Sequence, residues 1–146
     1  MTTMESKARA QQRVAQLAAN DRFARAMGVS LVDGGPGHAK VAMTVREEHL
    51  NFNGGCHGGA IFAFADAAFG LASNSHGLIA AGIDAHITYQ TAAGLGDELL
   101  ASAAEVSRSR KLAVYRIDVT RADGAMISSF TGTVYITARH HEEGGG

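Results

Sequence analysis

Residues 49–74 read HLNFNGGCHGGAIFAFADAAFGLASN, and this stretch decides the fold. A glycine-rich segment ends at Gly59. The almost chargeless run that follows predicts a helix from Gly58 to about Ser75 that is apolar on nearly every side, so we expect the rest of the chain to surround it. The helix carries one carboxylate, Asp66, and a lone acid in an apolar setting is costly unless it is paired or functional. The sequence therefore places the chemistry at Asp66.

The composition favours one domain with no preference for nucleic acid or membrane. The chain has 146 residues, a formal net charge of -1 and a sequence pI near 6.6, which give no global attraction to polyanions. Cys56 is the one cysteine, so no internal disulfide is possible. No apolar run approaches the roughly 20 residues of a membrane span. We expect a cytoplasmic protein.

Hydrophobic periodicity predicts a short series of elements around the central helix. Residues 1–28 are expected to form a helical arm. Apolar residues recur at helical spacing between Glu5 and Met27, and Gly28 is expected to end the helix. Residues 29–138 form the main domain, and residues 139–146 a disordered tail. The expected strands lie at 38–47, 80–90, 97–107, 111–120 and 125–137, and the last three form a meander.

Strand 111–120 indicates how the sheet meets the helix. Its residues alternate, with Ala113, Tyr115, Ile117 and Val119 on one side, which predicts one packed face and one partly wet face. Short turns between successive strands predict antiparallel pairing. The sequence therefore predicts an α+β fold in which a curved antiparallel sheet wraps around a long central helix.

One set of spacings resembles a known family. Asn51 is followed six residues on by His57-Gly58-Gly59, and Asp66 lies nine residues past the histidine. This pattern resembles the hotdog-fold acyl-CoA thioesterases of the phenylacetate-pathway (PaaI) type. The resemblance implies hydrolysis of an acyl-coenzyme A, with a hydroxyphenylacetyl-CoA-like substrate class, no metal and no cofactor. It also implies a homo-oligomer, commonly a tetramer built from dimers.

The spacing of Gly58 and Asp66 predicts a dimer independently of the family. The two residues lie eight positions apart, which is about 12 Å along a helix axis and far beyond a proton-transfer contact. If two copies of the helix lie antiparallel across a two-fold axis, the Gly58 end of one approaches the Asp66 region of the other. The homodimer is then the minimal active unit.

Each candidate residue has a chemical and a structural interpretation. Gly58 at the start of the helix offers an unpaired amide to an oxyanion, or it serves only as a turn. Asp66 acts as nucleophile or base, or it anchors the helix to strand backbone. Asn51 holds water or the thioester carbonyl, or it stabilises a turn. His57 orients the oxyanion site, or it bonds only to backbone.

The other candidate sites are weaker. Cys56 beside His57 is a poor nucleophilic pair, because adjacent side chains in an extended segment point apart. The remaining histidines lack the spacing of metal ligands, so no metal site is expected. Coenzyme A carries phosphates that Lys or Arg usually bind. The local candidates are Arg108, Arg110 and Lys111, which also suit a soluble hairpin tip.

Two competing functions remain at this point. A hotdog-fold acyl-CoA dehydratase or hydratase commonly has a histidine shortly after the acid, whereas Leu71 stands five residues past Asp66. A non-catalytic acyl-CoA-binding module would not need Asp66, and it would usually carry a regulatory domain. An assay for thiol release separates the hydrolase from the module.

Overall fold

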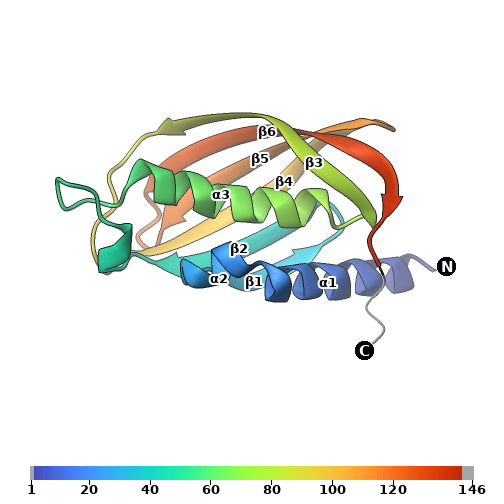
Figure 1. The fold of residues 1–146 in the computed structure, drawn as a ribbon, viewed down its shortest axis with the longest axis horizontal. Coiled ribbons are helices and arrows are strands. Elements are labelled where there is room, and N and C mark those ends of the chain that lie inside the picture. The colour runs from blue at the N-terminus through green and yellow to red at the C-terminus, as the bar shows by residue number, and fades with distance from the viewer. Residues whose placement is uncertain (1, 143–146) are drawn as a thin grey trace.

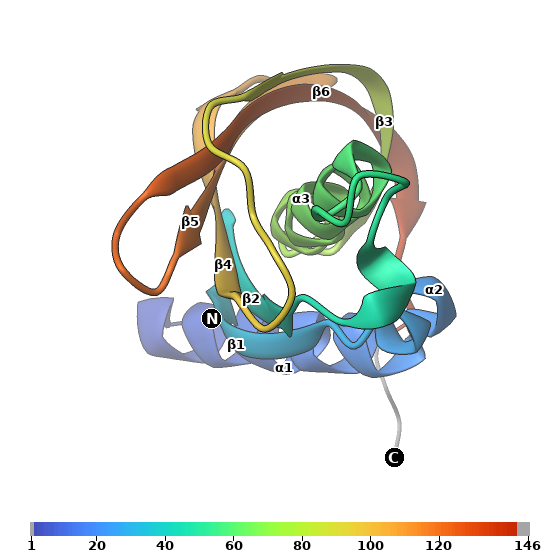
Figure 2. The ribbon, with the colours of Figure 1, turned by 90° about the vertical axis from the view of Figure 1, so that its left-hand side faces the viewer.

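The computed structural model describes residues 2–142. Within these residues the secondary structure elements are α1 (Thr3–Asn20), α2 (Arg22–Ala26), β1 (Ser30–Gly35), β2 (His38–Thr44), η1 (Glu47–His49), α3 (Gly58–Ser73), β3 (Leu78–Tyr89), β4 (Glu98–Arg108), β5 (Leu112–Arg121) and β6 (Met126–His140). All strands pair antiparallel in the order β1-β2-β4-β5-β6-β3. The sheet curls around α3, as Figures 1 and 2 show from two directions. The predicted fold class is confirmed.

The core lies between α3 and the concave face of the sheet. Phe69 of α3 packs against Tyr115 and Phe130, with ring centroids 6.0 and 5.6 Å apart. Gly132 of β6 makes room for this ring, because a Cβ there would lie 2.6 Å from a Phe69 carbon. The alternation in β5 is confirmed, since Tyr115 and its inward neighbours are at most 1% exposed. The meander is also confirmed, because β4, β5 and β6 are neighbours.

The N-terminal segment is two helices rather than one. α1 and α2 are separated by Asp21, which has extended backbone angles and whose Oδ1 accepts a hydrogen bond from the Ala24 amide (3.0 Å). Asp21 therefore caps α2 and breaks the helical run. The expected stop at Gly28 is confirmed, because its φ is 83°. Val14 of α1 is fully buried and joins the core, so this segment packs on the domain.

Strand β1 was not expected from the sequence. Its residues end in Asp33-Gly34-Gly35 before a proline, a composition typical of turns. Pairing with β2 makes the segment a strand, and Gly34 admits the side chain of Val14, since a Cβ at Gly34 would lie 2.5 Å from it. The strand thus depends on neighbours that local sequence does not reveal.

The expectation that α3 is buried all round is wrong for the single protomer. Its inner face is covered by the sheet, but Gly59, Asp66 and Gly70 are exposed on its outer face. Figure 2 shows this side of the helix open, between the β3 edge above and α2 below. Asp66 therefore lies on an uncovered face of an otherwise buried helix.

Strand β3 forms the edge of the sheet beside that open face. It pairs with β6 on one side only, and residues 81–86 are all exposed, including Ile83 at 60%. A long edge strand with apolar residues is a template for pairing with another chain. The open helix face and the open sheet edge thus lie next to each other.

The C-terminal boundary differs from the expected one. β6 continues through His140, which pairs with Leu78, so residues 139 and 140 belong to the sheet rather than to a tail. Backbone pairing with β3 extends the strand beyond the last periodic residues. The rest of the expected tail from residue 143 onward lies outside the described residues. Within residues 2–142, no helix is both long enough and apolar enough to cross a membrane.

Candidate active site

The loop before α3 is held by Asn51. Its side-chain oxygen accepts hydrogen bonds from the amides of Asn53 (2.8 Å) and Gly55 (3.2 Å). This is the turn interpretation of Asn51, because the oxygen is used within the loop. The NH₂ group of the Asn51 side chain is not used in these bonds and can donate a hydrogen bond. Phe52 projects from the same loop and is 97% exposed.

His57 caps the start of α3. Its Nδ1 accepts a hydrogen bond from the Gly59 amide (2.7 Å), and its carbonyl accepts from Ala60 (2.9 Å) and Ile61 (3.2 Å). Among the described residues these bonds satisfy the first-turn amides except that of Gly58, which has no protein acceptor. The cap therefore leaves one helix N-terminal donor available. This is the donor that the sequence assigned to an oxyanion.

Tyr89 supports this end of the helix and was missed by the sequence interpretation. Its hydroxyl donates to the Gly58 carbonyl (3.1 Å) from the last residue of β3. A Cβ at Gly58 would lie 3.4 Å from the Tyr89 ring, so the tyrosine packs directly over the glycine. No local motif marks this residue, because the contact joins positions 31 apart in the chain.

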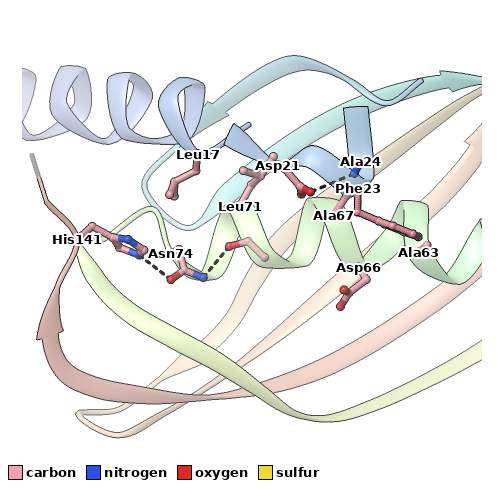
Figure 3. Close-up of a pocket in the computed structure, with 11 residues that line it drawn as sticks. Leu17, Asp21, Phe23, Ala24, Ala63, Asp66, Ala67, Leu71, Asn74 and His141 are labelled. Atoms are coloured by element: carbon pink, nitrogen blue, oxygen red, sulfur yellow. Dashed lines mark hydrogen bonds between the residues drawn. The ribbon is translucent and has the colours of Figure 1, made fainter. Parts of the chain in front are cut away.

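Asp66 lies in a groove of about 440 Å³ between α3 and the two N-terminal helices (Figure 3). Although the side chain is solvent-exposed in the protomer, partial burial raises its pKa, and the nearby Asp21 carboxylate raises it further. Within residues 2–142 the carboxylate accepts no hydrogen bond from protein. A carboxylate with a raised pKa and no partner is suited to act as a base. The anchor interpretation of Asp66 has no bond to support it.

A second hollow continues the groove along the same helix face. It has a volume of about 260 Å³ and shares Phe23 and Ala63 with the Asp66 groove. It reaches His57 and Gly59 at the start of α3. Together the two hollows form a trough along the open face of α3. Sequence analysis did not assign to the site the residues outside α3 that line the Asp66 groove, which are Leu17, Asp21, Phe23, Ala24, Asn74 and His141.

The alternative nucleophile and metal sites find no support. Burial raises the pKa of the Cys56 thiol, and the Asp97 charge adds to this, so the thiolate is disfavoured. His49 is buried, and both its ring nitrogens are engaged, by the Arg46 amide (2.9 Å) and the Met27 carbonyl (2.8 Å). Among residues 2–142 no cluster of three His, Cys, Asp or Glu side chains suits a metal ion.

The three cations expected at coenzyme A phosphates lie around the β4–β5 turn. Arg108 approaches the Glu105 carboxylate at 3.9 Å, so part of its charge is balanced within the protein. Arg110 and Lys111 are exposed in the turn. None of the three lines the Asp66 groove.

Replacing His57 separates its capping role from a chemical one. His57→Ala removes the acceptor of the Gly59 amide and is expected to cost about 1 kcal/mol of unfolding free energy, measured by urea denaturation. His57→Asn supplies another side-chain acceptor and is expected to restore the stability. A large loss of activity in a fully stable His57→Asn protein would instead assign the ring a direct part in the reaction.

Comparisons with known proteins identify the family of this chain. Residues 53–128 match the family model described as Thioesterase superfamily. The chain is 34% identical over 113 residues to the acyl-coenzyme A thioesterase PaaI of Escherichia coli, covering 77% of this chain and 81% of the relative. The structure of E. coli PaaI superposes with a TM-score of 0.90 at 30% identity, covering 92% of this chain and 98% of that one.

Two further structures extend the likeness. An N33D mutant of the phenylacetic acid degradation protein PaaI from Thermus thermophilus superposes with a TM-score of 0.76 at 41% identity, covering 79% of this chain and 98% of that one. The protein smu.793 of Streptococcus mutans, solved bound to acetyl CoA, has a TM-score of 0.75 at 31% identity, covering 77% and 91%. The family model spans α3 and the strands β3, β4 and β5, and the chain belongs to the thioesterase superfamily as a PaaI-type hotdog acyl-CoA thioesterase.

Proposed function

We propose that the enzyme hydrolyses its thioester at a site shared by two protomers. The observation that carries this is the separation of the two functional groups on one helix. The amide of Gly58, which has no acceptor among the described residues, begins α3, and Asp66 lies eight residues later, about 12 Å along the axis. Asp66 lines one end of the trough along the open face of α3, and His57 and Gly59, the neighbours of Gly58, line the other end. Two antiparallel copies of α3 would bring the amide of each protomer toward the carboxylate of its mate.

The open surfaces of the protomer support this arrangement. The outer face of α3 presents small residues beside Asp66, including Ala63 and Gly70, which let a second helix approach closely. The exposed edge of β3 lies next to it and has unpaired backbone groups along residues 81–86. Pairing β3 with its symmetry mate would satisfy that edge. We propose a homodimer as the active unit and a homotetramer as the full assembly.

The chemistry follows from the two groups. Asp66 takes a proton from a water molecule, and the water oxygen bonds to the thioester carbonyl carbon. The carbonyl oxygen gains negative charge next to the Gly58 amide, which donates a hydrogen bond to it. The carbon–sulfur bond then breaks, and the leaving thiolate takes up a proton. If Asp66 attacks directly, an acyl-aspartyl anhydride forms first and water hydrolyses it.

Gly58→Pro tests the amide directly. Proline suits the first position of a helix, and His57 before it already has an extended ψ of 134°, so the substitution removes the N–H group without breaking α3. Losing one oxyanion donor is expected to lower kcat by about 10²- to 10³-fold. Circular dichroism and the melting temperature check the fold. A folded Gly58→Pro enzyme with unchanged kcat would remove this amide from the mechanism.

Mixing two inactive variants tests whether the site is shared. A dimer of one Gly58→Pro protomer and one Asp66→Asn protomer contains one intact pair of groups and one doubly damaged pair. Coexpression in equal amounts is expected to restore about a quarter of the parental activity, because half of the dimers are mixed and each has one working site. No recovery in purified mixed dimers would contradict a site built from both chains.

Asp21 is expected to tune the pH dependence of the reaction. Its charge helps to hold the pKa of Asp66 above the ordinary range, and the base is active only when ionised. Asp21→Asn keeps an oxygen to cap α2 and removes the negative charge. The pKa of Asp66 then falls, so the acid limb of the kcat/KM profile is expected to move to lower pH. A limb that stays in place would show that another group titrates there.

The proposed substrate class is an aryl-acyl or related acyl-coenzyme A, with hydroxyphenylacetyl-CoA as the first candidate and phenylacetate catabolism as the setting. Support comes from the E. coli structural relative, which is described as a protein of the phenylacetic acid degradation operon. The single Cys56 in a chain without disulfides suits the cytoplasm. A panel of acyl-CoA thioesters with free thiol as the readout tests the class. Binding without thiol release would favour a non-catalytic module.

The coenzyme phosphates need cationic contacts in this scheme. We propose the β4–β5 turn as one candidate, with Arg108, Arg110 and Lys111 as the donors. All three side chains are exposed, and the charge of Arg108 is partly balanced by Glu105 at 3.9 Å. Replacing Arg110 and Lys111 by Gln would raise the KM for an acyl-CoA if they bind it.

A further inference from the structure

Phe23 of α2 lies where the two hollows of the trough meet. It lines the groove of about 440 Å³ that holds Asp66, and it also lines the hollow of about 260 Å³ that reaches His57 and Gly59. Ala63 of α3 lines both hollows as well. Figure 3 shows the Phe23 side chain extending from α2 toward Ala63. The Phe23 ring and Ala63 therefore form the junction between the two hollows.

The Phe23 ring is largely uncovered in the protomer, with 67% of the residue exposed. Apolar side chains continue its surface in both hollows. These are Leu17 and Leu71 in the larger groove, and Met27 and Leu50 in the smaller hollow. Aromatic surface that is exposed beside other apolar groups gains free energy when an apolar ligand covers it. The trough therefore offers such a ligand a continuous apolar wall, with Phe23 at the junction.

Two side chains from the segment between β2 and α3 hold the end of α2, and with it Phe23, in place. Arg46 donates from Nη2 to the Ala26 carbonyl (2.9 Å). His49 accepts from the Arg46 amide at Nδ1 (2.9 Å), so its Nε2 carries the proton and donates to the Met27 carbonyl (2.8 Å). The Phe23 ring is thus presented from an anchored helix. A ligand that packs against an anchored ring loses less entropy on binding.

The wall that Phe23 forms precedes the segment that matches the family model. That segment begins at residue 53, after α1 and α2, and it contains Asp66 and the start of α3. The proposed reacting groups therefore come from the matched segment, whereas Phe23 is contributed by the N-terminal helices. A separate element can set the preference for the acyl group without moving the reacting groups.

We propose that Phe23 is a specificity-determining residue that packs against the acyl group of the substrate and favours aryl-acyl groups over acetyl. This inference rests on the proposed function, because it takes the acyl group to start at the shared site. From the Gly58 end of one protomer the acyl group can enter the smaller hollow, and from the Asp66 region of its mate it can enter the larger groove. Phe23 lines both hollows, so either path meets a Phe23 ring. An aryl group gains ring contacts there that a methyl group cannot make.

Binding of two thioethers tests the wall without requiring hydrolysis. 2-Phenylethyl-CoA and ethyl-CoA carry a methylene in place of the carbonyl of phenylacetyl-CoA and acetyl-CoA, so they cannot be hydrolysed as thioesters. In titration calorimetry, Phe23→Ala is expected to weaken binding of 2-phenylethyl-CoA about tenfold or more and to leave binding of ethyl-CoA unchanged. Phe23→Leu keeps an apolar wall and is expected to fall between Phe23→Ala and the parent.

Arg22→Ala is the matched control on the same helix. Arg22 is exposed and is not among the described residues that line either hollow. The control is expected to keep the parental ratio of the two thioether affinities. The melting temperature checks the fold of Phe23→Ala, which should be retained because the ring is largely exposed.

Three results of this comparison would overturn the proposal. Equal weakening of both thioethers by Phe23→Ala would show that the ring acts on the coenzyme part of the ligand. Unchanged binding of both, or no binding of either by the parent, would place the acyl group away from Phe23. A Phe23→Ala protein that light scattering finds monomeric beside an oligomeric parent would assign the ring to the contact between protomers.

A tryptophan probe locates the acyl group without removing the aromatic wall. The chain contains no tryptophan, so Phe23→Trp introduces a lone indole at the junction of the hollows. 2-Phenylethyl-CoA is expected to shift its fluorescence emission to shorter wavelength, because the aryl group displaces water from the indole. Ethyl-CoA carries the same nucleotide and is expected to cause no such shift. Equal responses to the two ligands would contradict a contact between Phe23 and the acyl group.

Steady-state kinetics separates this inference from the proposed function. Phe23→Ala is expected to lower kcat/KM for phenylacetyl-CoA about tenfold relative to kcat/KM for acetyl-CoA. A parent that hydrolyses neither thioester would remove the proposed function, whereas the thioether titration would still report on Phe23. A parent that hydrolyses both, with the same preference after Phe23→Ala, would overturn this inference and leave the proposed function standing.

Discussion

The Asp66→Asn enzyme is expected to lose about 10²- to 10⁴-fold in kcat for an acyl-CoA, the range that a positioned general base contributes. Asparagine has nearly the same shape but cannot take a proton or attack the carbonyl carbon. The groove that holds Asp66 opens on the exposed face of α3, so a side chain of the same shape leaves the groove unchanged. Release of free thiol under saturating substrate measures the effect.

The same variant is expected to fold as well as the parent or better. A raised pKa means that the ionised carboxylate is disfavoured in the folded state. That cost is present at neutral pH and is relieved only as the pH falls through the raised pKa of Asp66. Asparagine carries no charge, so it removes the cost. The melting temperature at pH 7 should therefore be equal to or above the parental value.

Two outcomes would contradict this account of Asp66. Full activity in the folded variant would show that the carboxylate takes no part in the reaction. An unfolded variant would instead support the interpretation that Asp66 is a structural residue that anchors α3 to strand backbone. Where activity is lost as expected, a single turnover of the parent in ¹⁸O-labelled water tests for a covalent route. Label in the Asp66 carboxylate indicates an acyl-enzyme anhydride that water cleaves at the aspartyl carbon, whereas label only in the product acid excludes cleavage at that carbon.

Gly70→Arg is expected to yield a folded but inactive monomer. Gly70 is exposed on the open face of α3, one turn beyond Asp66, and a Cβ added there meets no atom within 4 Å. The protomer therefore accommodates a side chain at this position. A partner helix lying across this face would not, because arginine adds bulk and charge where close approach is needed. Light scattering should report monomers, and hydrolysis should fall to the level of Asp66→Asn.

Gly70→Ala is the matched control for this prediction. Alanine is favoured over glycine inside a helix by about 1 kcal/mol, so the control should raise the stability of the protomer while a methyl group still permits a close helix contact. A Gly70→Arg protein that remains dimeric and active would show that protomers pair through another surface. A Gly70→Arg protein that unfolds would be uninformative about pairing, and mixed dimers of the Gly58 and Asp66 variants then decide the question.

The elements and the candidate site were predictable where the information was local. The helix at Gly58, the four later strands and the inward face of β5 follow from apolar periodicity, which backbone geometry imposes on any sequence. The Asn51, His57 and Asp66 spacing predicted the family, and the family model and relatives confirm it. Strand β1 was not predictable, because its pairing with β2 makes it a strand. The break between α1 and α2 was not predictable either, because it depends on the hydrogen bond by which the Asp21 side chain caps α2.

The sequence by itself determined that an apolar helix follows a glycine-rich segment and carries a single acid. Helix formation and the position of the acid depend on residues that are close together in the chain. Only the tertiary structure decided that Asp66 lines an open groove and that the Gly58 amide finds no acceptor among residues 2–142. It also decided that Tyr89 packs on Gly58. The physical reason is that exposure and hydrogen-bond pairing depend on which distant segments cover each face, and local periodicity carries no information about those segments.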